Sequence, residues 1–165
     1  MVDKLAIKAT LQDFLERTNI RHLAYQEDDG FCELVISDAA SRGIDVQAFH
    51  KYLVGGITMG QTAYKHLKSI PARVIISLYT AFLIYLDDQF SEDVTMLKEF
   101  CHLFCARKPQ AHPMLDHYAN LLLEMTEYFS PLASDLVVLS GMKMVTALVL
   151  ENRMQATPVS RFVFF

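Results

Sequence analysis

The stretch SIPARVIISLYTAFLIYLDD, residues 69–88, decides the fold class. It opens with a helix-start signal, because Ser69 can cap a helix and Pro71 then falls in the first turn, where its missing N–H does no harm. The residues that follow are apolar on nearly every face of a helix, and helices of this kind are buried at the centre of a bundle. We therefore predict one long central helix that ends near Asp88.

The rest of the chain has the spacing of helices that pack around this central one. Gly43 predicts the end of one helix, and Gly55-Gly56 predicts a break between two others. No stretch has a convincing strand pattern, so the expected fold is all-α, in one domain, as suits 165 residues. The surrounding helices are expected at roughly residues 5–15, 31–41, 46–53, 57–67, 94–104, 114–129 and 131–152.

Four carboxylates follow the central helix within seven residues: Asp87, Asp88, Glu92 and Asp93. If the helix continues, Asp88 and Glu92 share one face. Like charges repel, and the C-terminal end of a helix disfavours anions, so a compensating cation is expected. Mg²⁺ suits such a site because it takes one or two carboxylates, keeps waters and shares its other positions with substrate phosphates. A solvated acidic loop is the alternative interpretation.

An apolar helix that ends in Asp-Asp with further carboxylates resembles the aspartate-rich motif of class I terpene synthases. The segment Gln110-Ala111-His112-Pro113 resembles the corresponding segment of the fungal trichodiene synthase family, and Tyr128-Phe129-Ser130-Pro131 is also similar. Residues 56–64 resemble the lead-in to the metal-binding helix. The resemblance covers roughly residues 31–152, and the combination of motifs is more specific than the aspartate motif alone.

The resemblance implies an incomplete class I isoprenoid-synthase bundle around an apolar pocket, in which Mg²⁺ helps to ionise farnesyl diphosphate before cyclisation to a sesquiterpene. Asp87 matches the first aspartate of the motif and is the expected metal ligand. Asp88 matches the second aspartate, which in the family more often supports the ligands than binds the metal. The third carboxylate of the family stands at the position of Ser91, and here it is displaced to Glu92, which we assign to the metal, or to Asp93.

A carbocation needs a dry cavity, and aromatic faces can stabilise it. Tyr79, Thr80 and Leu83 lie one to two turns before Asp87, on the side towards which Asp87 points. We predict that these three residues line the substrate pocket. The alternative is that they are ordinary core residues.

Class I terpene synthases carry a second metal motif downstream, and none is found after Asp93; the partial mimic at residues 38–45 is expected to be a helix end. We therefore expect residues 1–165 to be one partial, truncated terpene synthase domain, inactive alone and prone to self-association through open apolar helix faces. Two alternatives stay open. One is a non-catalytic helical module or pseudoenzyme that binds another chain, and the other is a protein similar to the trans-prenyltransferases.

The formal charge of −4 and the 52% apolar content argue against a disordered chain and against nucleic-acid binding. The longest uncharged apolar run, residues 74–86, is too short to span a bilayer as a helix. Three cysteines without framework spacing favour a reducing compartment, so the expected location is the cytoplasm. His112, which precedes Pro113, is expected to form a structural hydrogen bond.

Overall fold

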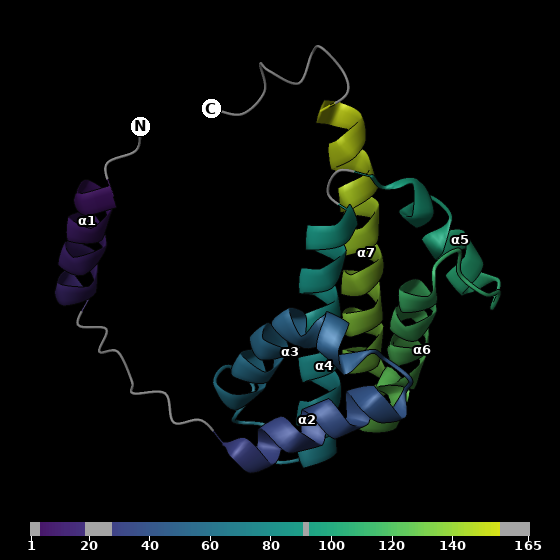
Figure 1. Cartoon of the computed structure of the whole chain (residues 1–165), viewed down its shortest axis with the longest axis horizontal. Helices are drawn as coiled ribbons and strands as arrows, with labels where there is room; N and C mark the ends of the chain where they lie inside the picture. The colour runs from purple at the N-terminus through teal and green to yellow at the C-terminus, as the bar shows by residue number, and fades with distance from the viewer. Residues whose placement is uncertain (1–3, 19–27, 91–92, 156–165) are drawn as a thin grey trace.

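The computed structural model describes residues 4–18, 28–90 and 93–155, and these residues form α-helices and one short 3₁₀ helix, with no strand among them (Figure 1). The all-α prediction is confirmed. The elements are α1 (Lys4–Arg17), α2 (Asp29–Ser41), α3 (Val46–Gln61), α4 (Ile70–Phe90), the 3₁₀ helix η1 (Thr95–Leu97), α5 (Phe100–Cys105), α6 (Pro113–Tyr128) and α7 (Pro131–Gln155).

Helix α4 is the central helix that the sequence predicts. Its start is capped as expected, since the backbone N–H of Ala72 donates to the Ser69 hydroxyl at 3.3 Å. Along its length the helix packs against α2, α3, α6 and α7. Leu78, Phe82 and Leu86 are completely buried in these contacts. The burial of apolar side chains on several sides of α4 organises the bundle.

The predicted break at Gly55-Gly56 is wrong, because α3 runs unbroken from Val46 to Gln61. Glycine weakens a helix by about 1 kcal/mol, but here it permits close packing. A Cβ at Gly56 would lie 2.2 Å from the backbone oxygen of Ser77 on α4, and one at Gly60 would lie 2.1 Å from the Ser77 hydroxyl oxygen. The two glycines, four residues apart, therefore bring the backbones of α3 and α4 together.

The prediction of a single helix over residues 94–104 is also wrong, because this segment forms η1 followed by the short helix α5. Val94, Leu97 and Phe100 are buried at a spacing of three residues. That spacing fits the 3.0 residues per turn of a 3₁₀ helix better than the 3.6 of an α-helix. The backbone N–H of Thr95 donates to the Asp93 carboxylate at 2.9 Å and fixes the first turn.

Two of the described helices, α4 and α7, are long and apolar enough to cross a membrane by length and composition. Most of α4 is buried among the other helices, as in the core helix of a soluble protein, whereas only 22% of the corresponding window of α7 is buried. Such helices are weak indications of a membrane span. One side of α7 packs against α4 and α6, and its opposite apolar side has no cover in the part of the chain that the structure describes.

We call this surface the outer face of α7 and define it by Leu132, Leu136, Leu139 and Leu150, which are all more than half exposed. Helix α1 also stands apart from the other helices (Figure 1), and its apolar side chains are exposed. The expectation of open apolar helix faces is met at these two places.

Candidate functional site

The C-terminal end of α4 positions the two aspartates of the motif. The helix continues through both because Leu86 and Phe90, four residues apart, are buried and hold the last turn in the core. The ring of Phe90 lies edge-on to His112 with a centroid distance of 6.0 Å. Asp87 and Asp88 lie between these anchors and are exposed.

Asp88 is the centre of a polar cluster that joins α4 to α3. Its Oδ2 accepts hydrogen bonds from the Lys51 ammonium at 2.8 Å, the Tyr52 hydroxyl at 2.6 Å and the Gln89 amide at 3.0 Å. Gln89 also donates to the Tyr52 hydroxyl at 2.9 Å. The hydrogen bond from Lys51, followed by those from Tyr52 and Gln89, holds the pKa of the Asp88 carboxyl well below its usual range. This arrangement makes Asp88 a link between helices.

Asp87 is placed differently from its neighbour. Its carboxylate is exposed and makes no hydrogen bond or ion pair with any residue that the structure describes. Hydrogen bonding from the side chain of Thr95, and then from its backbone N–H, lowers the pKa of the Asp93 carboxyl, and Glu92 lies outside the described residues. In the described ranges no group of three or more His, Cys, Asp or Glu side chains is arranged to hold a metal ion. Among the described carboxylates of the motif, Asp87 is thus the one without a hydrogen bond or ion pair, and the assignment of all three metal ligands stays a prediction.

The three predicted pocket residues lie at different depths. Tyr79 is buried, and its hydroxyl donates to the backbone oxygen of Val137 on α7 at 3.4 Å. Burial raises the pKa of this phenol. Thr80 and Leu83 are half-buried and lie seven and four residues before Asp87, on the same side of α4. The pair could contact a ligand held by Asp87, whereas Tyr79 connects α4 to α7.

A cavity of about 380 Å³ opens beside the Asp88 cluster, lined by Phe49, Lys51, Tyr52, Tyr85, Gln89 and Met114 among others. Sequence reasoning missed it, and it also missed the roles of Lys51 and Tyr52. The residues that line the cavity come from α3, α4 and α6. No local pattern links Lys51 to an aspartate 37 positions later. Only the close approach of α3 to α4 brings them together.

The Gln110–Pro113 motif has a structural role at the start of α6. His112 caps the helix, since its Nδ1 accepts a hydrogen bond from the Met114 N–H at 3.2 Å, and Pro113 occupies the first turn. The backbone N–H of Gln110 donates to the Asp116 carboxylate at 2.7 Å. The expectation of a structural hydrogen bond at His112 is confirmed.

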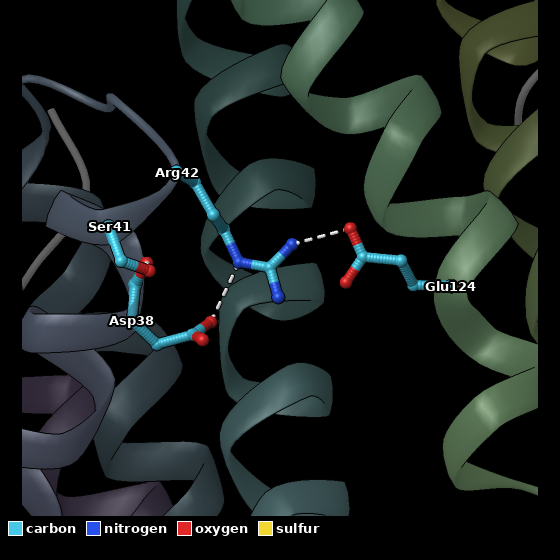
Figure 2. A network of polar contacts seen from close by, with 4 residues as sticks. All are labelled: Asp38, Ser41, Arg42 and Glu124. Carbon is cyan, nitrogen blue, oxygen red and sulfur yellow. Dashed lines mark hydrogen bonds and ion pairs between the residues drawn. The ribbon is translucent and has the colours of Figure 1, made fainter.

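A second ionic cluster fixes α2 to α6 on another side of the bundle. Figure 2 shows the Arg42 guanidinium between two carboxylates, at 2.7 Å from Asp38 and 2.8 Å from Glu124. Burial acts to lower the pKa of Arg42, but the hydrogen bonds to Glu124 and Asp38 outweigh it and raise the pKa above its ordinary value. Gly43, which follows, ends α2 with a φ of 78°, in the left-handed region that favours glycine. The Arg42 guanidinium therefore has a structural role between α2 and α6, and the sequence analysis did not predict this ion-pair cluster.

Known proteins with similar sequences are terpene synthases. The chain is 26% identical to alpha-cuprenene synthase COP6 of Coprinopsis cinerea over 163 residues, which is 96% of this chain and 50% of that protein. It is 23% identical to Monoterpene synthase 25 of Postia placenta over 91% of this chain and 45% of that protein. Terpene synthase BipA of Cochliobolus sativus is 31% identical over 62% of this chain and 31% of its own length.

These relatives are fungal terpene synthases at low identity, and they support a relationship of this chain to the terpene synthase family. They do not single out the trichodiene synthase type. The chain spans about half the length of the curated relatives that it matches. No family model matches the chain, and no solved structure matches it.

Proposed function

We propose that this chain is the N-terminal part of a Mg²⁺-dependent class I terpene synthase of the trichodiene synthase type that acts on farnesyl diphosphate. The observation that carries the proposal is the exposed carboxylate of Asp87 at the end of a buried helix, in a chain similar to alpha-cuprenene synthase over 96% of its length. Half of that relative lies outside the similarity, so we also propose that residues 1–165 are inactive without further helices.

The residues at the end of α4 fit a hydrated magnesium ion. Mg²⁺ in proteins is often bound through one or two carboxylates, several waters and the phosphates of a substrate. Asp87 offers an accessible carboxylate, and Asp88 has a second oxygen besides the one bound by Lys51 and Tyr52. When bound, the ion would neutralise charge on a diphosphate leaving group.

The chain's own residues would hold and shield the substrate. Thr80 and Leu83 share the face of α4 with Asp87, so an apolar tail that extends from a diphosphate at Asp87 would run along them. Tyr79, which is tied to α7, would limit the depth of such a groove. Lys51 would keep Asp88 ionised and oriented, and thereby fix the last turn of α4.

The test compares Asp87→Asn with Asp135→Asn, which removes the same charge from an exposed position on α7. Binding of pyrophosphate with Mg²⁺ is measured by titration calorimetry on protein shown by circular dichroism to be helical. We expect Asp87→Asn to weaken binding by about tenfold or more, equivalent to about 1.4 kcal/mol, and Asp135→Asn to leave it unchanged. Equal affinities of the native chain, Asp87→Asn and Asp135→Asn for pyrophosphate with Mg²⁺ would reject the site.

Turnover is measured in the same preparation with farnesyl diphosphate and Mg²⁺, as release of pyrophosphate and volatile products. We expect none from the chain alone. A terpene product that disappears in Asp87→Asn would uphold the site but reject the proposal that this half is inactive.

The second candidate is a non-catalytic helical module that binds another chain. The observation that favours it is the outer face of α7, where Leu132 is 71% exposed. In that case a helical, well-folded chain would bind neither Mg²⁺ nor pyrophosphate. We propose the cytoplasm as the location under either function.

A further inference from the structure

Helix α1 needs a partner to be stable. It has 14 residues, and an isolated helix shorter than about 12–15 residues is marginal in water. Ile7, Leu11, Phe14 and Leu15 share one side of it, at positions i, i+4, i+7 and i+8. These four side chains are 44–57% exposed. Helix formation here would be favoured if that side were covered.

The outer face of α7 offers a matching surface. Leu132, Leu136 and Leu139 occupy positions i, i+4 and i+7 and are 71%, 60% and 52% exposed. The other large apolar side chains that are exposed on α2, α3, α4 and η1 occur there singly or in pairs. The N-terminal half of α7 is therefore the longest open apolar stripe of the described bundle.

The two surfaces agree in length and in charge. At 1.5 Å per residue, the stripe from Ile7 to Leu15 is about 12 Å long, and the stripe from Leu132 to Leu139 is about 10 Å long. Lys8 borders the apolar side of α1, and Asp135 borders the stripe on α7. Opposite charges at the two edges favour this pairing over two copies of the same stripe.

A short segment connects α1 to α2, and α2 lies near the start of α7. Residues 18 and 28 are ten positions apart, and an extended chain covers at most about 33–36 Å in ten residues. Phe31, in the first turns of α2, lies against Arg73 at the start of α4, with 4.4 Å between the guanidinium carbon and the ring centroid. Leu34 and Ile70 share a cavity of about 210 Å³ with Tyr128, which precedes α7. Helix α2 thus begins at the end of the bundle where α7 begins.

We propose that α1 docks, through Ile7, Leu11, Phe14 and Leu15, on Leu132, Leu136 and Leu139 of the same chain. The tether keeps α1 at an effective concentration of about millimolar near this surface. A second copy at micromolar concentration would compete poorly for the same leucines. The docked helix would cover the most exposed part of α7 and leave Leu150, 11 residues beyond Leu139, open.

The test is amide hydrogen exchange of the full chain, followed by mass spectrometry over α1. Leu136→Ser removes the centre of the stripe, and Leu150→Ser makes the same change on the outer face of α7 beyond it. Both leucines are more than half exposed, so both variants are expected to fold, which circular dichroism verifies. Leu11→Ser makes the reciprocal change on α1.

In the native chain and in Leu150→Ser, we expect the amides of α1 to exchange about tenfold more slowly than the amides of an unfolded peptide. Leu136→Ser and Leu11→Ser should both remove this protection. Three results would each overturn the proposal: no protection of α1 in the native chain, equal protection in Leu136→Ser, or protection that disappears on dilution, which would identify a second copy as the partner.

Discussion

Adding one methyl group at Gly56 tests the close approach of α3 and α4. In Gly56→Ala the new Cβ would lie 2.2 Å from the backbone oxygen of Ser77 and 3.0 Å from the Cβ of Ala81. Both atoms are held rigidly on α4, so neither can move unless the helix itself shifts. At Gly55, by contrast, the new Cβ would lie 2.5 Å from the Cδ1 of Ile84, the far end of a side chain that is 40% exposed. The neighbouring glycine therefore supplies a matched control, Gly55→Ala.

The geometry sets the size of the expected difference. To reach ordinary contact distance at Gly56, the two backbones must separate by roughly 1 Å, and overpacking of this kind costs about 1–3 kcal/mol. Alanine regains about 1 kcal/mol of helix propensity at either position. A Cβ only 2.2 Å from a backbone oxygen belongs to the upper part of that range, about 2–3 kcal/mol, so after the gain in propensity we expect Gly56→Ala to lower the free energy of unfolding by about 1–2 kcal/mol. Rotation of Ile84 costs about 0.5–1.5 kcal/mol, so Gly55→Ala should stay within about 0.5 kcal/mol of the native chain.

Urea unfolding of the three proteins, followed by far-ultraviolet circular dichroism, measures these free energies. The slopes of the transitions should agree, since the same surface is exposed on unfolding. Equal stabilities of the two variants, or a more stable Gly56→Ala, would refute the packing argument and would restore the interpretation of the glycine pair as a flexible break.

Two further predictions concern stability and use the same urea assay. Arg42→Met should cost about 1–3 kcal/mol, because Asp38 and Glu124, each about one-third exposed, lose a shared cation. Arg17→Met, whose ion pair is largely exposed, should cost less than about 0.5 kcal/mol, and similar losses for both arginines would contradict the assignment. Tyr118→Phe should be neutral or should stabilise the fold by up to about 1–2 kcal/mol, since the buried hydroxyl has no partner among the described residues. A clear loss of stability in that variant would reveal a hydrogen bond to the hydroxyl.

Signals carried by a few neighbouring residues predicted the local structure well. Ser69 and Pro71 mark the start of α4, Gly43 marks the end of α2, and His112 caps α6. Each of these effects depends on backbone groups within three residues, so the sequence alone contains the necessary information. The apolar length of α4 likewise predicted its burial.

Features that depend on contacts between distant segments could not be predicted in this way. Gly55 and Gly56 have the sequence signature of a turn, and only the backbone of α4 beside them explains an unbroken helix. Asp87 and Asp88 are equivalent in the sequence and are both exposed, yet Asp87 makes no hydrogen bond or ion pair with a described residue whereas Asp88 is bound to Lys51 from α3. Patterns along the chain do not reveal such partners.

The ion pair between Arg42 and Glu124 has a consequence for the order of folding. The two residues are 82 positions apart, so the pair closes a much longer loop than the contact between the consecutive helices α3 and α4. Contacts of short loop length form with the smaller entropic loss and are favoured in the early stages. The pair then belongs to the late steps, so its removal should accelerate unfolding and leave the folding rate nearly unchanged. Arg42 would in this way determine how long α6 stays docked against α2.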